Sequence, residues 1–211
     1  MHWVLVANGA FVCTPDLKHV LDTADCVVGV DGGCCHVEVL GRNPDLVLGD
    51  LDSVPAELVA LYEEQSIEII RHRVDKDFTD LELALELAME RGATRITVLG
   101  ATGGRVDHFL ANIFALTRCV EHGIPACIRD EAQSITVVDR ELMLQGCIGD
   151  IVTVLPLTEQ ADNVWLHGMC YPLHGETLFF GSSRGVSNVL SAPQAQITVG
   201  SGRVLVIHRR V

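Results

Sequence analysis

Short apolar runs alternate with helical patterns over the first 130 residues, and this alternation constrains the fold more than any other feature. The runs are nearly continuous in apolar character and lie at Trp3–Ala7, Cys26–Val30, Leu46–Leu48, Glu68–Ile70, Arg95–Leu99 and Ala126–Arg129. Strands that are apolar at successive positions are buried on both faces, which is typical of parallel sheets. Such strands with helices between them favour an α/β domain with an open, mostly parallel sheet.

The segments between these runs predict helices. They lie near Asp16–Thr23, Cys35–Leu40, Ala56–Gln65, Asp80–Arg91 and Val106–His122. The fourth begins with the sequence of a capping box, in which Thr79 is the N-cap and Glu82 reaches back to its backbone. Gly92 and Gly123 follow the last two helices, where a left-handed residue commonly ends a helix.

The pattern changes after about residue 132, where no segment has a convincing helical period. Short runs separated by Gly, Pro, Asn and Ser predict strands at Ser134–Asp139, Ile151–Leu155, Asn163–His167, Leu178–Phe180, Ala195–Val199 and Val204–His208. Regularly spaced strands with turn residues between them are typical of a small sandwich or barrel. We therefore predict an α/β domain at residues 1–132 and a smaller all-β domain at residues 133–211.

The charge balance argues against two classes of partner. The 211 residues include 15 Lys plus Arg and 28 Asp plus Glu, which gives a formal net charge of −13. Nucleic acids and anionic membranes are bound by clustered basic side chains, so neither partner is expected. No apolar run approaches the roughly 18 residues that indicate a membrane span. The acidic side chains are therefore expected to be solvated, to bind a metal ion, or both.

The eight cysteines show no CxxC pair and lie at Cys13, Cys26, Cys34, Cys35, Cys119, Cys127, Cys147 and Cys170. Zinc sites and disulfide frameworks usually have tighter and more regular spacing. We interpret the cysteines mostly as small buried hydrophobes in a reducing compartment. The N-terminal residues lack the charged region and cleavage site of a signal peptide, so a cytoplasmic location is expected.

Aspartates gather next to the ends of three predicted strands. The three clusters are Asp31 with two glycines after it, Asp50 with Asp52, and Asp75 with Asp77 and Asp80. The carboxyl ends of the strands line the ligand crevice of an open parallel sheet. Neighbouring carboxylates are costly without a cation, and such oxygen ligands suit Mg²⁺ together with substrate phosphates. Each cluster also has a structural interpretation as a turn or a helix start, but three together favour a metal–phosphate site.

A glycine-rich loop precedes the last predicted helix of the first domain. Gly103 and Gly104 allow the backbone to approach a phosphate, and the helix N-terminus behind them offers free N–H groups. Arg105 adds a guanidinium suited to a bidentate grip on phosphate oxygens. The loop matches neither GxxxxGK[ST] nor GxGxxG, so it is not a Walker A loop and a dinucleotide site is not indicated.

Helical spacing places Arg105, His108 and Asn112 on one face of that helix. Asp107 points elsewhere and is either a nucleoside ligand or a first-turn acid. His108 has a second interpretation as a structural histidine with its hydrogen bonds satisfied.

Four motifs in this order resemble those of the thiamine pyrophosphokinase family. They are Asp31-Gly32-Gly33, Gly49-Asp50-Leu51-Asp52-Ser53, Lys76-Asp77-Phe78-Thr79-Asp80-Leu81-Glu82-Leu83-Ala84-Leu85, and Gly103-Gly104-Arg105-Val106-Asp107-His108 with Asn112. Two later segments, Tyr171-Pro172-Leu173 and Ser183-Arg184-Gly185-Val186-Ser187-Asn188, resemble the family's C-terminal domain, so the resemblance spans nearly the whole chain. It implies Mg²⁺-dependent transfer of diphosphate from ATP to the hydroxyethyl group of thiamine, with release of AMP. It also implies a homodimer, in which the partner's β-rich domain completes each active site.

The resemblance and the strand-end argument together assign Asp50, Asp52 and Asp80 to Mg²⁺, with Asp50 as the candidate acceptor of the hydroxyl proton. Asp77 joins these catalytic candidates, since it is placed to orient Lys76 or a second metal ion. The residues expected to bind ATP are Asp31, Gly103, Gly104, Arg105, Asp107, His108 and Asn112. Those expected to bind the thiamine substrate are Lys76, Thr79, Ser187 and Asn188, with Trp165, Tyr171, Phe179 and Phe180 as possible stacking surfaces.

Two other functions stay open at this point. A metal-dependent phosphohydrolase would use clustered carboxylates on a similar sheet but would need no acceptor other than water. A non-catalytic nucleotide-binding module is the other alternative, although it would need no second and third aspartate cluster.

Overall fold

The computed structural model describes residues 1–72 and 77–211. These residues form two compact units, Met1–Glu131 and Ala132–Val211. The predicted domain boundary lies one residue from this division. Each unit has its own sheet architecture and its own core, and the two are described in turn.

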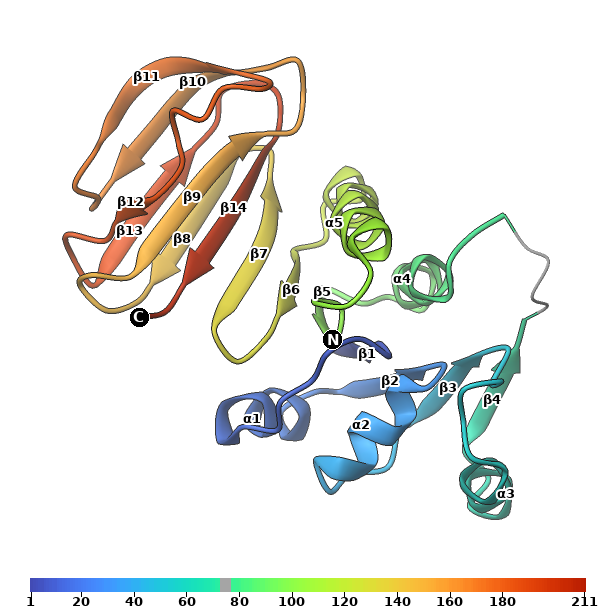
Figure 1. The fold of residues 1–211 in the computed structure, drawn as a ribbon. Coiled ribbons are helices and arrows are strands. Elements are labelled where there is room, and N and C mark those ends of the chain that lie inside the picture. The colour runs from blue at the N-terminus through green and yellow to red at the C-terminus, as the bar shows by residue number, and fades with distance from the viewer. Residues whose placement is uncertain (73–76) are drawn as a thin grey trace. The chain divides into compact units, whose positions relative to one another are not determined.

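The first unit alternates strands and helices along its whole length (Figure 1). Its elements are β1 (His2–Val6), α1 (Pro15–Asp22), β2 (Cys26–Val30), α2 (Gly33–Val39), β3 (Leu46–Gly49), α3 (Ala56–Glu64), β4 (Glu68–Arg71), α4 (Asp80–Glu90), β5 (Arg95–Leu99), α5 (Val106–Glu121) and β6 (Ala126–Arg129). The strands pair in the order β6-β5-β1-β2-β3-β4, and all five pairings are parallel. Figure 1 shows α1, α2 and α3 on one face of this sheet and α4 and α5 on the other.

Burial explains why the central strands are apolar at successive positions. All five residues of β1 are buried, as are four of the five in β2, because helices cover both faces of the sheet. The edge strand β4 is only partly buried and carries charged residues at its ends. The predicted α/β class with an open parallel sheet is therefore confirmed for this unit.

Strand order changes direction at β1, and this position matters for ligand binding. Successive strands step from β1 to β4 along one side, and the chain then returns over the other face to place β5 against β1. The loops after β1 and β5 therefore leave the sheet toward opposite faces. In α/β folds the crevice between such loops, at the carboxyl ends of the strands, is where ligands bind.

The second unit is an antiparallel β-sandwich. Its strands are β7 (Gln133–Val138), β8 (Glu141–Gln145), β9 (Ile151–Pro156), β10 (Gln160–His167), β11 (Leu173–Phe179), β12 (Asn188–Val189), β13 (Gln194–Thr198) and β14 (Val204–Arg209). Within this unit the strands pair in the orders β12-β9-β14-β7 and β11-β10-β13-β8. Side chains from both sheets, such as Val154 and Ile197, share one core. The predicted all-β class is confirmed, and β8 and β12 are additions that the sequence analysis did not predict.

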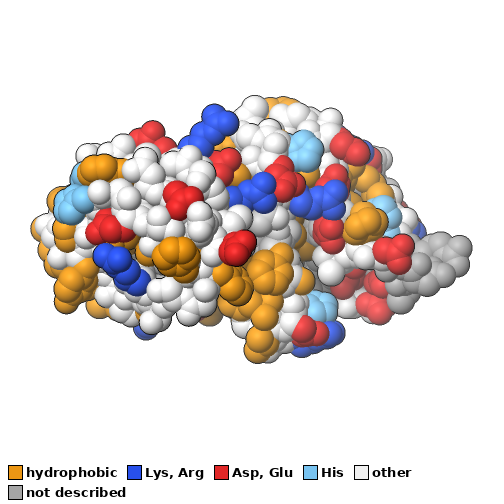
Figure 2. Space-filling view, turned by 90° about the horizontal axis from the view of Figure 1, so that it is seen from above, with side chains coloured by type: hydrophobic (Ala, Val, Ile, Leu, Met, Phe, Trp, Pro, Cys, Tyr) orange, Lys and Arg blue, Asp and Glu red, His pale blue; other side chains and the backbone are white. Residues whose placement is uncertain are grey.

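Charged side chains of both signs are interspersed on the surface. Figure 2 shows acidic and basic side chains next to one another on the face that it presents. Arg91 pairs with Glu68 at 2.7 Å, and Arg129 pairs with Asp16 at 2.6 Å. Partly exposed pairs of this kind contribute at most about 1 kcal/mol each. Among the described residues, no helix has both the length and the apolar character needed to cross a membrane.

Candidate active site

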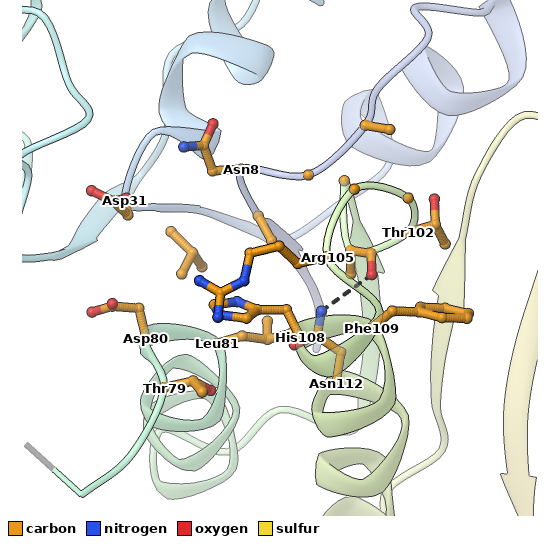
Figure 3. Close-up of a pocket in the computed structure, with 18 of the residues that line it drawn as sticks. Asn8, Asp31, Thr79, Asp80, Leu81, Thr102, Arg105, His108, Phe109 and Asn112 are labelled. Carbon is orange, nitrogen blue, oxygen red and sulfur yellow. Dashed lines mark hydrogen bonds between the residues drawn. The ribbon is translucent and has the colours of Figure 1, made fainter.

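A pocket of about 750 Å³ lies at the carboxyl ends of β1, β2 and β5, where the strand order changes direction. The loops after these strands line it, together with the first turns of α4 and α5. Figure 3 shows Asn8, Asp31, Asp80, Arg105 and His108 around it. Every lining residue comes from the first unit.

The loops after β1 and β5 are hydrogen-bonded to each other and form one wall of the pocket. The Gly9 N–H donates to the Gly100 carbonyl at 2.6 Å, and the Ala10 N–H donates to the Thr102 carbonyl at 3.0 Å. A Cβ on Gly9 would lie 2.4 Å from the Gly100 oxygen, so no larger residue fits this approach. The sequence analysis placed Gly103 and Gly104 of this wall in the site, and the fold adds the bonds that join their loop to Gly9 and Ala10.

His36 of α2 supports the same wall from behind. Its Nε2 lies 3.1 Å from the Gly9 carbonyl oxygen, and its ring stacks on Phe11 with centroids 4.8 Å apart. A nitrogen that donates to this carbonyl fixes the loop that carries Asn8 toward the pocket. His36 was missed because it belongs to no cluster of like residues along the sequence.

The start of α5 has the properties of an anion site. Gly104 has φ +66°, and no described residue beyond its chain neighbours has an atom within 4 Å of the place where a Cβ would lie, so a ligand can approach its backbone closely. Among the described residues, no side chain caps the N-terminus of α5. Its free N–H groups and the positive end of the helix dipole therefore face the pocket. These properties favour a phosphate at this end.

Arg105, His108 and Asn112 all line the pocket, whereas Asp107 is not among the lining residues. The Asn112 amide donates to the Ala101 carbonyl at 3.1 Å, which ties α5 to the loop after β5. Asp107 instead accepts two hydrogen bonds from Arg105. The Arg105 guanidinium lowers the pKa of Asp107 to about 2, so this carboxylate is ionised throughout the neutral range.

Three carboxylates form a tight cluster after β2 and β3. Oxygen atoms of Asp31, Asp50 and Asp52 all lie within 4.8 Å of one another. The Asp31 N–H donates to the Leu48 carbonyl at 2.7 Å and so holds the end of β2 against the end of β3. Asp31 was predicted among the ATP ligands, and the structure brings it to the two aspartates that were predicted to bind metal.

Leu51 determines how Asp50 and Asp52 are presented. Its backbone is left-handed, with φ +64°, a conformation that costs a non-glycine residue about 1–2 kcal/mol. Its side chain is only 7% exposed and packs in a core cluster with Val47 and Tyr62. The buried leucine therefore anchors the turn, and the two aspartates on either side of it are held close together.

The cluster fits a hard divalent cation. Carboxylate oxygens are the ligands that Mg²⁺ and Ca²⁺ prefer, and Mg²⁺ commonly uses one or two of them with substrate phosphates. Asp31 Oδ1 is buried and has no hydrogen-bond partner among the described residues, which is costly unless a cation or another donor reaches it. The donor set and this unsatisfied atom both point to a cation between the three side chains.

Asp80 lies across the pocket from these strands, at the start of α4. In Figure 3 its carboxylate points to the same side of the pocket as that of Asp31. Thr79 caps the helix, since its Oγ1 accepts a hydrogen bond from the Glu82 N–H at 3.2 Å. The predicted return bond from the Glu82 side chain is wrong: that carboxylate accepts from Arg118 of α5 at 2.7 Å instead.

The remaining predicted residues lie elsewhere. Lys76 falls outside the described residues, and Asp77 is exposed and is not among the pocket-lining residues. Ser187 and Asn188 belong to the second unit, where Ser187 is exposed with φ +58°. Asn188 is buried, and both its amide atoms bind the backbone of Tyr171. Asn188 therefore shapes the segment that carries Tyr171.

Comparisons with known proteins match both units. The family model described as "Thiamin pyrophosphokinase, catalytic domain" matches residues 17–128, and that of "Thiamin pyrophosphokinase, vitamin B1 binding domain" matches residues 136–204. A thiamine pyrophosphokinase of Bacillus subtilis (strain 168) is 28% identical over 210 residues, covering 96% of each chain.

Solved structures of the same kind resemble the whole fold. The crystal structure of thiamine pyrophosphokinase from Bacillus subtilis superposes with a TM-score of 0.89 at 27% identity, covering 100% of this chain and 99% of that one. Thiamin pyrophosphokinase from Geobacillus thermodenitrificans gives a TM-score of 0.86 at 29% identity, covering 100% and 98%.

Proposed function

This chain belongs to the thiamine pyrophosphokinase family, and we propose on that basis that it transfers diphosphate from ATP to the hydroxyethyl group of thiamine, releasing AMP. The observation that carries the proposal is that both family models match, in order, over nearly the whole chain. A phosphohydrolase would need no domain of the vitamin B1-binding kind, so that alternative is not supported. The enzyme is therefore a pyrophosphotransferase.

The pocket of the first unit is the proposed ATP site. The uncapped start of α5 and the open backbone at Gly104 suit phosphate oxygens, and Arg105 adds a positive charge beside them. Phosphoryl transfer needs positioning and neutralisation of spreading negative charge more than covalent help from the protein. We assign these groups to the triphosphate and the pocket wall around Asn112 to the nucleoside.

We propose that Asp31, Asp50 and Asp52 hold Mg²⁺, with Asp80 facing it from α4. The support is the approach of three carboxylates within 4.8 Å and the unsatisfied Asp31 oxygen. When bound, the ion would neutralise phosphate charge. Asp50 is the proposed acceptor of the thiamine hydroxyl proton, and its Oδ1 is held in place by the Asp52 N–H at 3.1 Å.

Thiamine is assigned to the second unit, with Tyr171 as the stacking surface. The Tyr171 side chain is 70% exposed, and Asn188 holds its backbone. Thiamine is a cation, so an aromatic face suits it. The assignment of Ser187 to thiamine rests on the family resemblance alone.

We further propose a homodimer in which the partner's second unit completes each pocket. Light scattering on the purified protein tests this proposal, and a monomer that turns over thiamine would contradict it.

A cytoplasmic location is also proposed. All eight cysteines are free thiols, as expected for a protein in a reducing compartment. Fractionation of cells that express the full chain would test the location.

The reaction itself is tested by measuring AMP release from MgATP with and without thiamine. We expect AMP and thiamine diphosphate to form in equal amounts, and only when thiamine is present. Release of phosphate or AMP at the same rate without thiamine would instead identify a hydrolase. MgATP binding without turnover would identify a nucleotide-binding module.

A further inference from the structure

Arg118 links the two helices that begin at the pocket. It lies near the C-terminal end of α5, and its guanidinium donates a hydrogen bond to Glu82 Oε1 of α4 at 2.7 Å. The same guanidinium forms an ion pair with Glu86 Oε1 at 2.6 Å. Glu82 and Glu86 are four residues apart, so they lie on one face of α4. A single arginine of α5 thus holds two successive turns of α4.

The helices that Arg118 joins carry different parts of the site. Asp80 begins α4, whereas Arg105 and His108 lie at the start of α5 (Figure 3). Helix α5 is continuous, so Arg118 lies about 18 Å along it from its first turn. A rotation of one helix against the other at Arg118 would therefore displace its pocket end.

The other contacts of α4 restrain it less specifically. Its buried residues are Leu81, Ala84, Leu85 and Ala88. The two alanines have small side chains that make few packing contacts with the sheet. Burial of apolar surface is not directional, whereas the hydrogen bond from the planar Arg118 guanidinium to Glu82 is, and the Glu86 contact adds the attraction of opposite charges. The link also explains why the Glu82 side chain is not used in the cap at Thr79.

We propose that Arg118 is a positioning residue for the transfer reaction: by holding Glu82 and Glu86, it sets the spacing between Asp80 and the Arg105–His108 end of the pocket. Arg118 is not among the residues that line the pocket, so it acts through the two helices. The inference rests on the proposed function, in which the cation and the triphosphate bind at these two helix ends. Arg118 should therefore affect the KM for MgATP and the kcat of the transfer.

The test compares Arg118→Met with Arg91→Met. Arg91 is the C-cap residue directly after α4, and it binds both oxygens of Glu68 at 2.7 Å. Its substitution also removes one charge and one two-bond ion pair, but at the opposite end of the helix from Asp80. For Arg118→Met we expect the KM for MgATP to rise about tenfold and kcat to fall about tenfold, as small misplacements of reacting groups commonly cause. The KM for thiamine should change by less than about twofold, and Arg91→Met should change none of the three constants.

Binding of a non-hydrolysable Mg·ATP analogue, measured by calorimetry, separates this inference from the proposed function. Wild-type protein that binds the analogue but releases no AMP with thiamine overturns the proposed function. An unchanged analogue Kd, together with unchanged kinetics in Arg118→Met, overturns the positioning role. Equal losses in Arg118→Met and Arg91→Met also overturn it, because general loosening of α4 then explains both.

Two milder variants keep the test decisive if Arg118→Met does not fold. Arg118→Lys keeps the charge but cannot bridge two carboxylates with a planar fork, so about half of the kinetic loss should return. Glu82→Gln removes one partner and should raise the KM for MgATP in the same direction. The double variant Glu82→Gln/Arg118→Lys should lose less than the product of the two single losses, and full multiplicativity would contradict the link.

Discussion

Arg105 and Asp107 form a two-bond ion pair at the exposed start of α5, with Nε to Oδ1 at 3.2 Å and a terminal nitrogen to Oδ2 at 2.6 Å. The Asp107 carboxylate thus occupies the guanidinium face that a phosphate would use. Arg105→Gln should raise the KM for MgATP about tenfold, since the variant loses a charge-assisted hydrogen bond to phosphate. Asp107→Asn should lower that KM by about twofold, because a neutral amide holds Arg105 less firmly. An increase in KM for Asp107→Asn would show that Asp107 is itself an ATP ligand.

The pH dependence of this pair follows from the lowered pKa of Asp107. Its carboxyl has a pKa of about 2 in the folded protein against an ordinary value of 3.8, so the pair is fully formed above pH 3.8 and is lost as the pH falls through about 2. We therefore expect no step in the KM for MgATP from Asp107 at neutral pH. NMR titration of the Asp107 carboxyl carbon checks the value directly.

Asp31→Asn tests the cation site. Asparagine tolerates the left-handed backbone of Asp31, with φ +50°, so the change removes a charge without adding strain. Without metal, the variant should melt about 2 °C higher than wild type, because it relieves repulsion among three carboxylates within 4.8 Å. Added Mg²⁺ should raise the melting temperature of wild type more than that of Asp31→Asn. The rate of AMP release by the variant should be at least about tenfold lower than that of wild type.

Asp22→Asn is the matched control for that experiment. Asp22 is a partly exposed acid that pairs with Lys18 at 3.6 Å on α1. The melting temperature of Asp22→Asn should rise with Mg²⁺ by the same amount as that of wild type. If Asp31→Asn keeps the full Mg²⁺-dependent rise in melting temperature, the assignment of Asp31 to the cation is wrong.

Asn188→Ala tests the segment assigned to thiamine. Asn188 is 4% exposed, its Oδ1 accepts from the Tyr171 N–H at 3.0 Å, and its Nδ2 donates to the Tyr171 carbonyl at 2.7 Å. Alanine leaves both backbone groups without these partners, which should cost about 1–3 kcal/mol in urea unfolding. The KM for thiamine should rise, while the Kd for the Mg·ATP analogue should not. The exposed Asn43→Ala variant is the control, and an equal effect there would refute this role for Asn188.

His2 should make folding sensitive to mild acid. It is 9% exposed, and its Nε2 lies 2.9 Å from Thr97 Oγ1 in β5. Burial, with a smaller contribution from nearby Arg95, lowers the pKa of His2 below 6.5. The unfolded chain therefore binds the proton more readily, and stability falls as the pH drops below 6.5. His2→Gln should weaken this loss between about pH 7.5 and about pH 5.5, as measured by urea unfolding at each pH.

The sequence predicts the central elements of the fold well because their patterns are complete. The run at Trp3–Ala7 is apolar throughout, the apolar stripe after Asp80 keeps a helical period over its whole length, and both elements form. Strand β8 was missed because its segment, Glu141–Gln145, is largely exposed at an edge and its pattern is weak. The strand predicted at Leu178–Phe180 begins at Leu173, where glycine and charged residues hide the alternation.

The candidate site was less predictable, because its geometry depends on which strands become neighbours. Sequence order places Asp50 and Asp52 together, but only the pairing of β2 with β3 brings Asp31 to them. The fate of the Glu82 side chain was likewise decided by tertiary structure. The backbone at Thr79 and any arginine that the fold brings close compete for the Glu82 carboxylate. Here that arginine is Arg118, which lies 36 residues away in the chain.

Leu51 couples the hydrophobic core of the first unit to the charged cluster at its surface. The backbone that carries Asp50 and Asp52 is held by Leu51 between them, which packs in one core cluster with Val47 and Tyr62. Their carboxylates therefore stay close together with that of Asp31, and a divalent ion held between them would neutralise their repulsion. A core substitution that loosens the packing around Leu51 would let the two aspartates move apart. It would therefore lower the affinity for the ion although none of the proposed ligands is changed.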